Sequence, residues 1–141
     1  MSDAAHFRLL AHTADIGLEA VAPTRNELFE VAARGLRAML FGRSPAEATL
    51  RLEVCLGADE PGELLVRWLN EILCLCEMTR LVPADFAIAA CTDRQLTATI
   101  SGEPFDPDRH TVERVAKAVT YHQLTVEERK GGWYARVYID L

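Results

Sequence analysis

The pattern of apolar residues predicts two short strands near the start of the chain. Apolar side chains fill much of 7–10 and then alternate with small or polar ones over 16–21. A period of two is typical of a strand that buries one face. The segment 12–15 between them reads His-Thr-Ala-Asp. We expect it to form a turn or kink that holds an imidazole and a carboxylate near a strand end.

Two later segments have the 3.6-residue period of amphipathic helices. The first begins after Thr24, whose hydroxyl can accept from the amide of Glu27 while the Glu27 side chain reaches back, and it ends at Gly42. Its apolar face consists of Leu28, Val31, Ala32, Leu36, Met39 and Leu40. The second helix covers about 63–79 and is more apolar. We expect its Trp68 in the core, because an aromatic side chain at helical spacing among leucines packs inward.

Further apolar alternation predicts three more strands, at 50–56, 86–90 and 96–100. The last two are joined by a predicted hairpin turn at 92–94. Residues 112–127 are ambiguous between helix and strand, because β-rich residues interrupt the helical spacing. We expect this stretch to form a long hairpin with the strand at 133–139, across a turn at 130–132.

The predicted order of elements is therefore β-β-α-β-α-β-β-β-β. Consecutive strands mostly look antiparallel, so the sequence predicts an α+β fold. We expect a mostly antiparallel sheet with two helices packed on one face, which is a two-layer sandwich. The length of 141 residues and the absence of an internal repeat or long linker predict a single domain over 1–141.

Composition and charge narrow the functional class. Half of the chain is apolar and the formal net charge is −6, and Lys and Arg form no cluster. A module that binds nucleic acid by itself usually has a basic face, so the balance favours a cation or a basic protein partner. The first residues lack the basic start and apolar run of a signal peptide, and no stretch is long enough to span a bilayer. We therefore expect a cytoplasmic, reducing location.

The four cysteines, Cys55, Cys74, Cys76 and Cys91, lack zinc-finger spacing. Cys74 and Cys76 lie two apart in a predicted helix, so they point to different faces. We expect buried free thiols, because a free Cys packs as a small hydrophobe.

One acidic constellation could carry chemistry. Asp15 lies near the start of the chain, and Asp140 lies next to the carboxylate of Leu141 at its end. Oxygen-only ligands suit Ca²⁺, Mg²⁺ or Mn²⁺ rather than zinc, and three carboxylates together repel unless a cation relieves them. Spacing alone leaves the alternative open that the two ends do not meet, which would leave a turn Asp and a solvated tail.

A second candidate set surrounds Lys117, which lies between small and apolar residues. Its ammonium could reach a carboxylate site, a phosphate or a partner, or it could lie on the wet face of a strand. His12, His110 and His122 could act as ligands or acid–base groups, or form structural hydrogen bonds. The sequence contains no Gly-rich phosphate loop, no nucleophile elbow and no nucleophilic Cys signature.

Several of these segments together resemble the archease family. The segment 12–17 resembles the opening motif of that family, and the matches keep the family's order over nearly the whole chain. They include Leu64-Leu65, Trp68-Leu69-Asn70-Glu71, Gly102-Glu103, His110, Lys117-Ala118-Val119-Thr120-Tyr121-His122 and Asp140-Leu141.

The resemblance implies an accessory protein, not an enzyme. Archeases assist the RtcB-type RNA ligase of tRNA splicing and RNA repair, help it to form its guanylylated histidine and turn over, and broaden its nucleotide use. The family's divalent cation, often calcium, would bind Asp15, Asp140 and the terminal carboxylate of Leu141. Its functionally important lysine aligns with Lys117. Contact with nucleotide or RNA would occur only through the ligase.

We place His12 and His122 beside Lys117 as candidate partner or activation residues. Two other functions remain open on the sequence. One is a stand-alone phosphohydrolase that depends on a divalent metal and uses His12 or His122 as acid–base partner. The other is a chaperone-like binding module whose acidic site is only structural.

Overall fold

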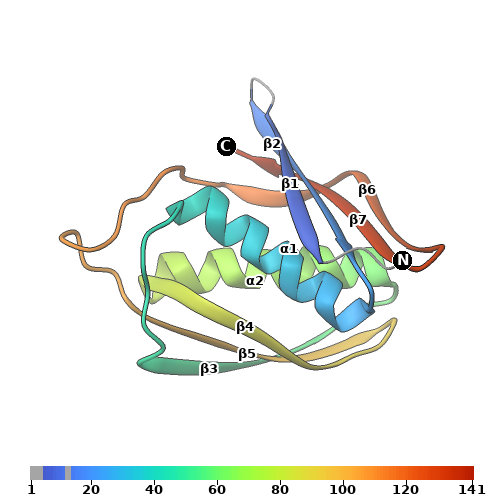
Figure 1. Cartoon of the computed structure of the whole chain (residues 1–141), viewed down its shortest axis with the longest axis horizontal. Coiled ribbons are helices and arrows are strands. Elements are labelled where there is room, and N and C mark those ends of the chain that lie inside the picture. Colours follow the sequence, from blue (N-terminus) through green and yellow to red (C-terminus); the bar gives the residue numbers. More distant parts are fainter. Residues whose placement is uncertain (1–4, 12–13) are drawn as a thin grey trace.

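The computed structural model describes residues 5–11 and 14–141 and has an α+β fold in three layers. A four-stranded antiparallel sheet in the order β1-β2-β7-β6 and a three-stranded antiparallel sheet in the order β3-β5-β4 enclose the helices α1 and α2 (Figure 1). The elements are β1 (His6–Ala11), β2 (Asp15–Ala22), α1 (Arg25–Phe41), β3 (Leu50–Gly57), α2 (Pro61–Met78), β4 (Leu81–Cys91), β5 (Gln95–Pro104), β6 (Ala118–Arg129) and β7 (Gly132–Asp140).

The α+β class, the antiparallel pairing and the order of elements are confirmed. The strands form two sheets instead of one, so the helices are covered on both sides. The reason is visible in α1, where Phe29 and Ala33 are buried beyond the face that the apolar spacing indicated. A helix with so wide an apolar surface needs a partner on each side. Accordingly α1 packs against β2 and also against β4.

The ends of both helices follow from local chemistry. Thr24 is the N-cap of α1, and its hydroxyl accepts from the Glu27 N–H at 3.2 Å. Gly42 is the C-cap, with a φ of 57° that favours glycine. Helix α2 begins at Pro61, two residues before the predicted start, because proline fits the first turn of a helix, where no N–H partner is needed. Trp68 is fully buried, as expected, and its ring N–H donates to the Phe29 carbonyl at 3.0 Å.

Strand β4 begins earlier than its alternation indicated. It starts at Leu81 and contains Pro83, and its register with β5 shifts twice. These irregularities interrupt the alternation of apolar and polar residues from which a strand is predicted. Proline is tolerated here because β4 is an edge strand.

The stretch 112–127, which the sequence left open between helix and strand, contains most of an extended segment and the first strand of the expected hairpin. Residues 111–117 have no regular structure, and β6 follows from Ala118 and pairs with β7. The register shifts between Thr120 and Thr125, and Gln123 within this bulge has a φ of 49°. The bulge explains why this strand lacked a clean alternation.

Asn70 of α2 positions the start of β6. Its amide group donates to the Val119 carbonyl at 3.1 Å and its oxygen accepts from the Val119 N–H at 2.9 Å. Both backbone groups belong to an edge strand, where they would otherwise have no protein partner. The side chain therefore fixes the helix against the strand that follows Lys117. In the described parts of the chain, no helix is long and apolar enough to cross a membrane.

We predict that Asn70→Ala lowers the free energy of unfolding by about 1–3 kcal/mol, because two backbone groups of Val119 lose their partners. Denaturant unfolding and amide hydrogen exchange at Val119 measure the effect. Asn26→Ala is the matched control, because the Asn26 side chain makes no hydrogen bond within the described structure. Equal losses in the two variants would contradict the role of Asn70.

We also predict that Gly102→Ala destabilises the fold by about 1–3 kcal/mol. A Cβ at Gly102 would lie 2.3 Å from the backbone oxygen of Val82, so β4 must move. Gly57→Ala is the control, because its Cβ would meet only the Arg94 oxygen at 3.7 Å. Guanidinium unfolding should separate the two variants, and a neutral Gly102→Ala would show that β4 shifts freely.

Candidate functional site

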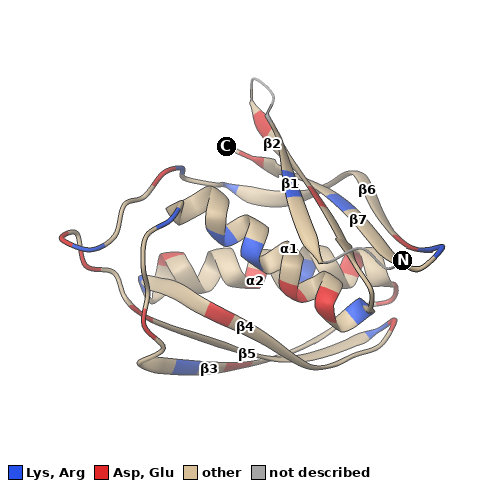
Figure 2. Cartoon of the chain, viewed as in Figure 1, with Lys and Arg blue, Asp and Glu red and all other residues tan. Residues whose placement is uncertain are grey.

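The start of β2 and the end of β7 meet at one end of the four-stranded sheet. β2 and β7 pair antiparallel, with Asp15 directly opposite Asp140. The Leu141 N–H donates to the Ala14 carbonyl at 3.3 Å. Figure 1 shows the C-terminus beside the start of β2, and Figure 2 shows acidic residues on both strands there. The juxtaposition that the sequence left open is therefore present.

Strand pairing sets the geometry of this acid pair. Residues directly opposite each other in an antiparallel pair share one face, with Cβ atoms about 4.5–5.5 Å apart, and like charges there are destabilising. Asp15 is half-buried and Asp140 is exposed. Within residues 5–11 and 14–141, neither carboxylate forms an ion pair or a side-chain hydrogen bond. The pair thus has unused acceptor capacity.

Another acid on the same strand face shows the contrast. Glu19 accepts from the Tyr134 hydroxyl at 2.6 Å and from the Arg8 Nε at 2.9 Å. These hydrogen bonds, with that of Tyr134 the strongest influence, hold the pKa of Glu19 below its usual range. Glu19 is therefore fully engaged in structure, whereas Asp15 is available.

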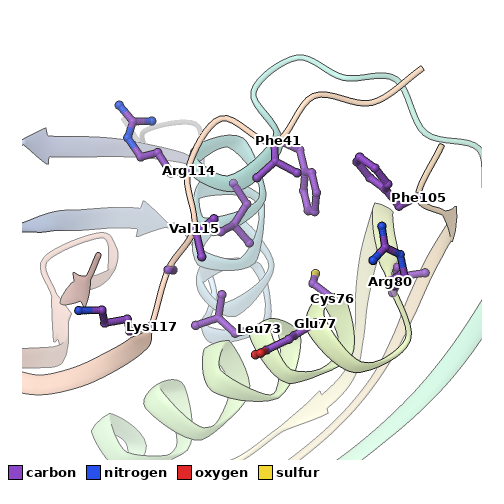
Figure 3. Close-up of a pocket in the computed structure, with 13 residues that line it drawn as sticks. Phe41, Leu73, Cys76, Glu77, Arg80, Phe105, Arg114, Val115 and Lys117 are labelled. Carbon is purple, nitrogen blue, oxygen red and sulfur yellow. The ribbon is translucent and has the colours of Figure 1, made fainter. Parts of the chain in front are cut away.

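Lys117 is fixed next to the acid pair through its backbone. Its N–H donates to the Asp140 carbonyl at 2.8 Å. Its side chain is exposed, forms no ion pair with the described residues, and borders a pocket on the helix side of the sheet. The structure therefore places the backbone of Lys117 at the acid pair and the residue itself at the edge of that pocket, with its charged end turned outward (Figure 3).

The histidines are placed differently from one another. His12 lies outside the described residues. His122 is exposed on the bulge of β6, with its ring 5.6 Å from that of Tyr138. Tyr138 lies opposite Gly17, two residues along from the acid pair and on the same face. A side chain at Gly17 would lie 3.0 Å from the Tyr138 ring, so glycine makes room for this ring. Through Tyr138, His122 therefore contacts the face of the sheet that carries the acid pair.

His110 belongs to a separate buried cluster. It is 4% exposed, and its Nδ1 accepts from the Asp106 N–H at 2.9 Å. Its Nε2 lies 2.9 Å from Glu103 Oε1, without the alignment of a well-formed hydrogen bond. Glu103 also pairs with Arg109 at 2.8 Å and accepts from the Glu47 N–H. This cluster ties down the loop after β5, so His110 has a structural role that its sequence neighbours did not reveal.

Two of the four cysteines, Cys76 and Cys91, are poor candidates for a reactive site. Cys55 and Cys74 are exposed, so the expectation of buried thiols is wrong for these two, which lie on the outward faces of β3 and α2. Burial raises the pKa of Cys76 to about 12 and that of Cys91 to about 11. Thiols that stay protonated at neutral pH are poor nucleophiles and poor metal ligands.

The donor chemistry of the acid pair fits a hard cation. Among residues 5–11 and 14–141, no three His, Cys, Asp or Glu side chains gather as a metal-binding group. Asp15 and Asp140 supply two carboxylates, and Leu141 follows Asp140 directly. Oxygen ligands of this kind suit Ca²⁺, Mg²⁺ or Mn²⁺, with remaining positions open to water or a ligand.

Comparisons with known proteins agree with this architecture. Residues 7–141 match the model of the archease protein family. Protein archease of Methanosarcina acetivorans is 34% identical over 139 residues, which are 96% of this chain and 95% of that protein. The solution structure of Protein 1598 of Methanobacterium thermoautotrophicum is similar with a TM-score of 0.79 and 28% identity, covering 96% of this chain and 98% of that one.

A crystal structure from Thermotoga maritima, described as an archease and possible chaperone, has a TM-score of 0.61 and 18% identity, covering 95% of this chain and 96% of that one. At this identity it supports the fold alone. The family model and the archaeal relative both extend over almost the whole length, and the chain belongs to the archease family.

Proposed function

We propose that this chain is a metal-binding accessory protein that activates an RtcB-type RNA ligase in tRNA splicing and RNA repair. It would promote guanylylation of the ligase and multiple turnover, and it would act in the cytoplasm. Membership of the archease family supports the accessory role. The observation that carries the proposal is the pair of facing carboxylates, Asp15 and Asp140, at the end of a rigid sheet.

Asp15, Asp140 and the terminal carboxylate of Leu141 would hold a divalent cation, with Ca²⁺ the first choice and Mg²⁺ or Mn²⁺ as alternatives. A bound cation would offset the repulsion between the carboxylates and supply a Lewis acid for phosphate oxygens. The register of β2 against β7 keeps the two carboxylates together, so the fold and not the cation defines their spacing.

The surrounding side chains would present this end of the sheet to the ligase. Lys117 would neutralise phosphate or carboxylate charge at the contact, and His122 would contact the partner from the exposed bulge beside Tyr138. His12 keeps its place as a candidate by sequence. Nucleotide and RNA would be bound by the ligase, and the reacting groups would be those of the ligase.

A stand-alone phosphohydrolase has less support. Such an enzyme needs an acid–base group or nucleophile directed at the metal. Of its two acid–base candidates, His12 lies outside the described residues and the ring of His122 lies against Tyr138. A chaperone-like module with a structural acid pair remains as the alternative that the experiments below separate.

In a multiple-turnover ligation assay, a substoichiometric amount of the wild-type chain should stimulate a purified RtcB-type ligase. Asp15→Asn and Lys117→Ala should fold but stimulate the ligase about tenfold less or weaker still. Asp15→Asn removes a metal ligand, and Lys117→Ala removes the ammonium beside the site. Asp85→Asn, an exposed acid on the other sheet, is the control and should stimulate normally. Normal stimulation by both site variants would show that the mechanism is wrong.

Calcium should stabilise the wild-type chain against thermal unfolding. The gain is about 2.7 kcal/mol at a free concentration of one hundred times Kd, and Asp15→Asn should lose it while Asp85→Asn keeps it. Without metal, Asp15→Asn should equal the wild type or exceed it by about 0.2–1 kcal/mol, because one of two facing charges is gone. If Asp15→Asn were instead less stable without metal, the acid pair would have a purely structural role.

A further inference from the structure

A cavity of about 540 Å³ lies between the C-terminal ends of the two helices and the extended segment 111–117. Its wall is mainly apolar, with Phe41 from the end of α1, Leu73 from α2 and Phe105 from the loop after β5 (Figure 3). The volume is in the range of sites that enclose a ligand or large side chains. Nothing in the role of the acid pair uses this cavity.

Exposed apolar side chains extend the cavity onto the surface. Val115 is 76% exposed and Val112 is 49% exposed, and both line the cavity. The segment that carries them is held by its backbone, because the Glu113 N–H donates to the Leu40 carbonyl at 2.8 Å and Lys117 bonds to Asp140. Apolar side chains held outward beside a concave site are typical of a surface that contacts another protein.

The charge around the cavity is opposite to that of the whole chain. Arg80, Arg114 and Lys117 line it against a single acid, Glu77, although the formal net charge of the chain is −6. None of these three cations forms an ion pair with any described residue. Figure 3 shows Arg80 beside Phe105 and the other two cations on the opposite side, with their charged ends turned outward. Such a rim favours acidic groups around an apolar centre.

Arg80 occupies a backbone position that does not favour it. Its φ is 54°, just after the end of α2, where glycine is usual. Its guanidinium lies 5.4 Å from the centre of the Phe105 ring. Replacing Arg80 by glycine removes the charge and also suits the local backbone. The chain therefore offers a variant that changes the rim without endangering the fold.

We propose that this cavity docks a segment of a partner protein that carries a large apolar side chain flanked by acidic residues. The apolar side chain enters between Phe41, Leu73 and Phe105, and the flanking acids meet the cationic rim. Its biological use rests on the proposed accessory function, which requires a surface for a protein partner. The chemistry of the segment is argued from the cavity alone.

The test is selection from a random-peptide display library on the immobilised full chain, followed by affinity measurements on the enriched peptides. We expect enrichment of Leu, Phe or Trp between acidic residues. Affinity should fall about tenfold or more in Val115→Glu, which places a like charge on the contact, and several-fold in Arg80→Gly. Met78→Glu is the matched control, because Met78 is 78% exposed at the end of α2 and does not line the cavity.

The inference is overturned by basic enriched peptides, by no enrichment, or by peptides that Val115→Glu and Met78→Glu affect equally. Asp15→Asn should bind the peptide normally, and Val115→Glu should keep calcium binding. If the wild type does not stimulate the ligase while peptide binding still depends on Val115, the proposed function fails and the docking site stands. If stimulation depends on Asp15 while peptide binding is indifferent to Val115, the docking site fails alone.

Discussion

The pairing of β2 with β7 is the constraint on which the rest of the structure depends. These two strands lie at the centre of the four-stranded sheet, and their inner faces carry Ile16, Leu18, Val137 and Ile139 against the helices. A slip of one residue would turn every one of these side chains to solvent, so burial fixes the register. The same register places Asp15 opposite Asp140. The hydrophobic core therefore determines the spacing of the acids, although it contains neither of them.

The acid pair and the cationic rim of the cavity are two neighbouring groups of opposite charge, and neither forms an ion pair with the described residues. Glu19 and Glu103, by contrast, have partners within the fold. The acid pair lies on the outer face of the four-stranded sheet. Arg80, Arg114 and Lys117 border the cavity, which lies on the helix side of that sheet. Lys117 joins the two through its backbone bond to Asp140. A partner that covers both would meet a negative and a positive surface in a fixed order, which favours one orientation of binding.

Local patterns predicted the elements well, because helix caps and alternation act over a few residues. Thr24 and Gly42 marked the first helix correctly. The bounds of the irregular strands were not predicted correctly. The bulge around Gln123 and the strand that contains Pro83 both interrupt the alternation with a period of two. The burial of both sides of α1 was also missed, because a single apolar stripe was sought where Phe29 widens the face.

The candidate site was harder to predict from the sequence than the helices and strands, because its residues are distant from one another in the chain. The residue chemistry and the family resemblance both selected Asp15 and Asp140, but nothing in the spacing required the two residues to meet. Asn70 and Glu103 were quoted as motif positions without a role. Their functions depend on contacts with Val119 and His110, across elements that no local pattern connects.

The central place of β7 has a consequence for the growing polypeptide. It is the last of the described strands to be synthesised, yet it inserts between β2 and β6. While the ribosome is still making it, β2 keeps an open edge that other chains could join. The acid pair comes into existence only when this gap closes. The facing carboxylates therefore distinguish finished molecules from those still folding.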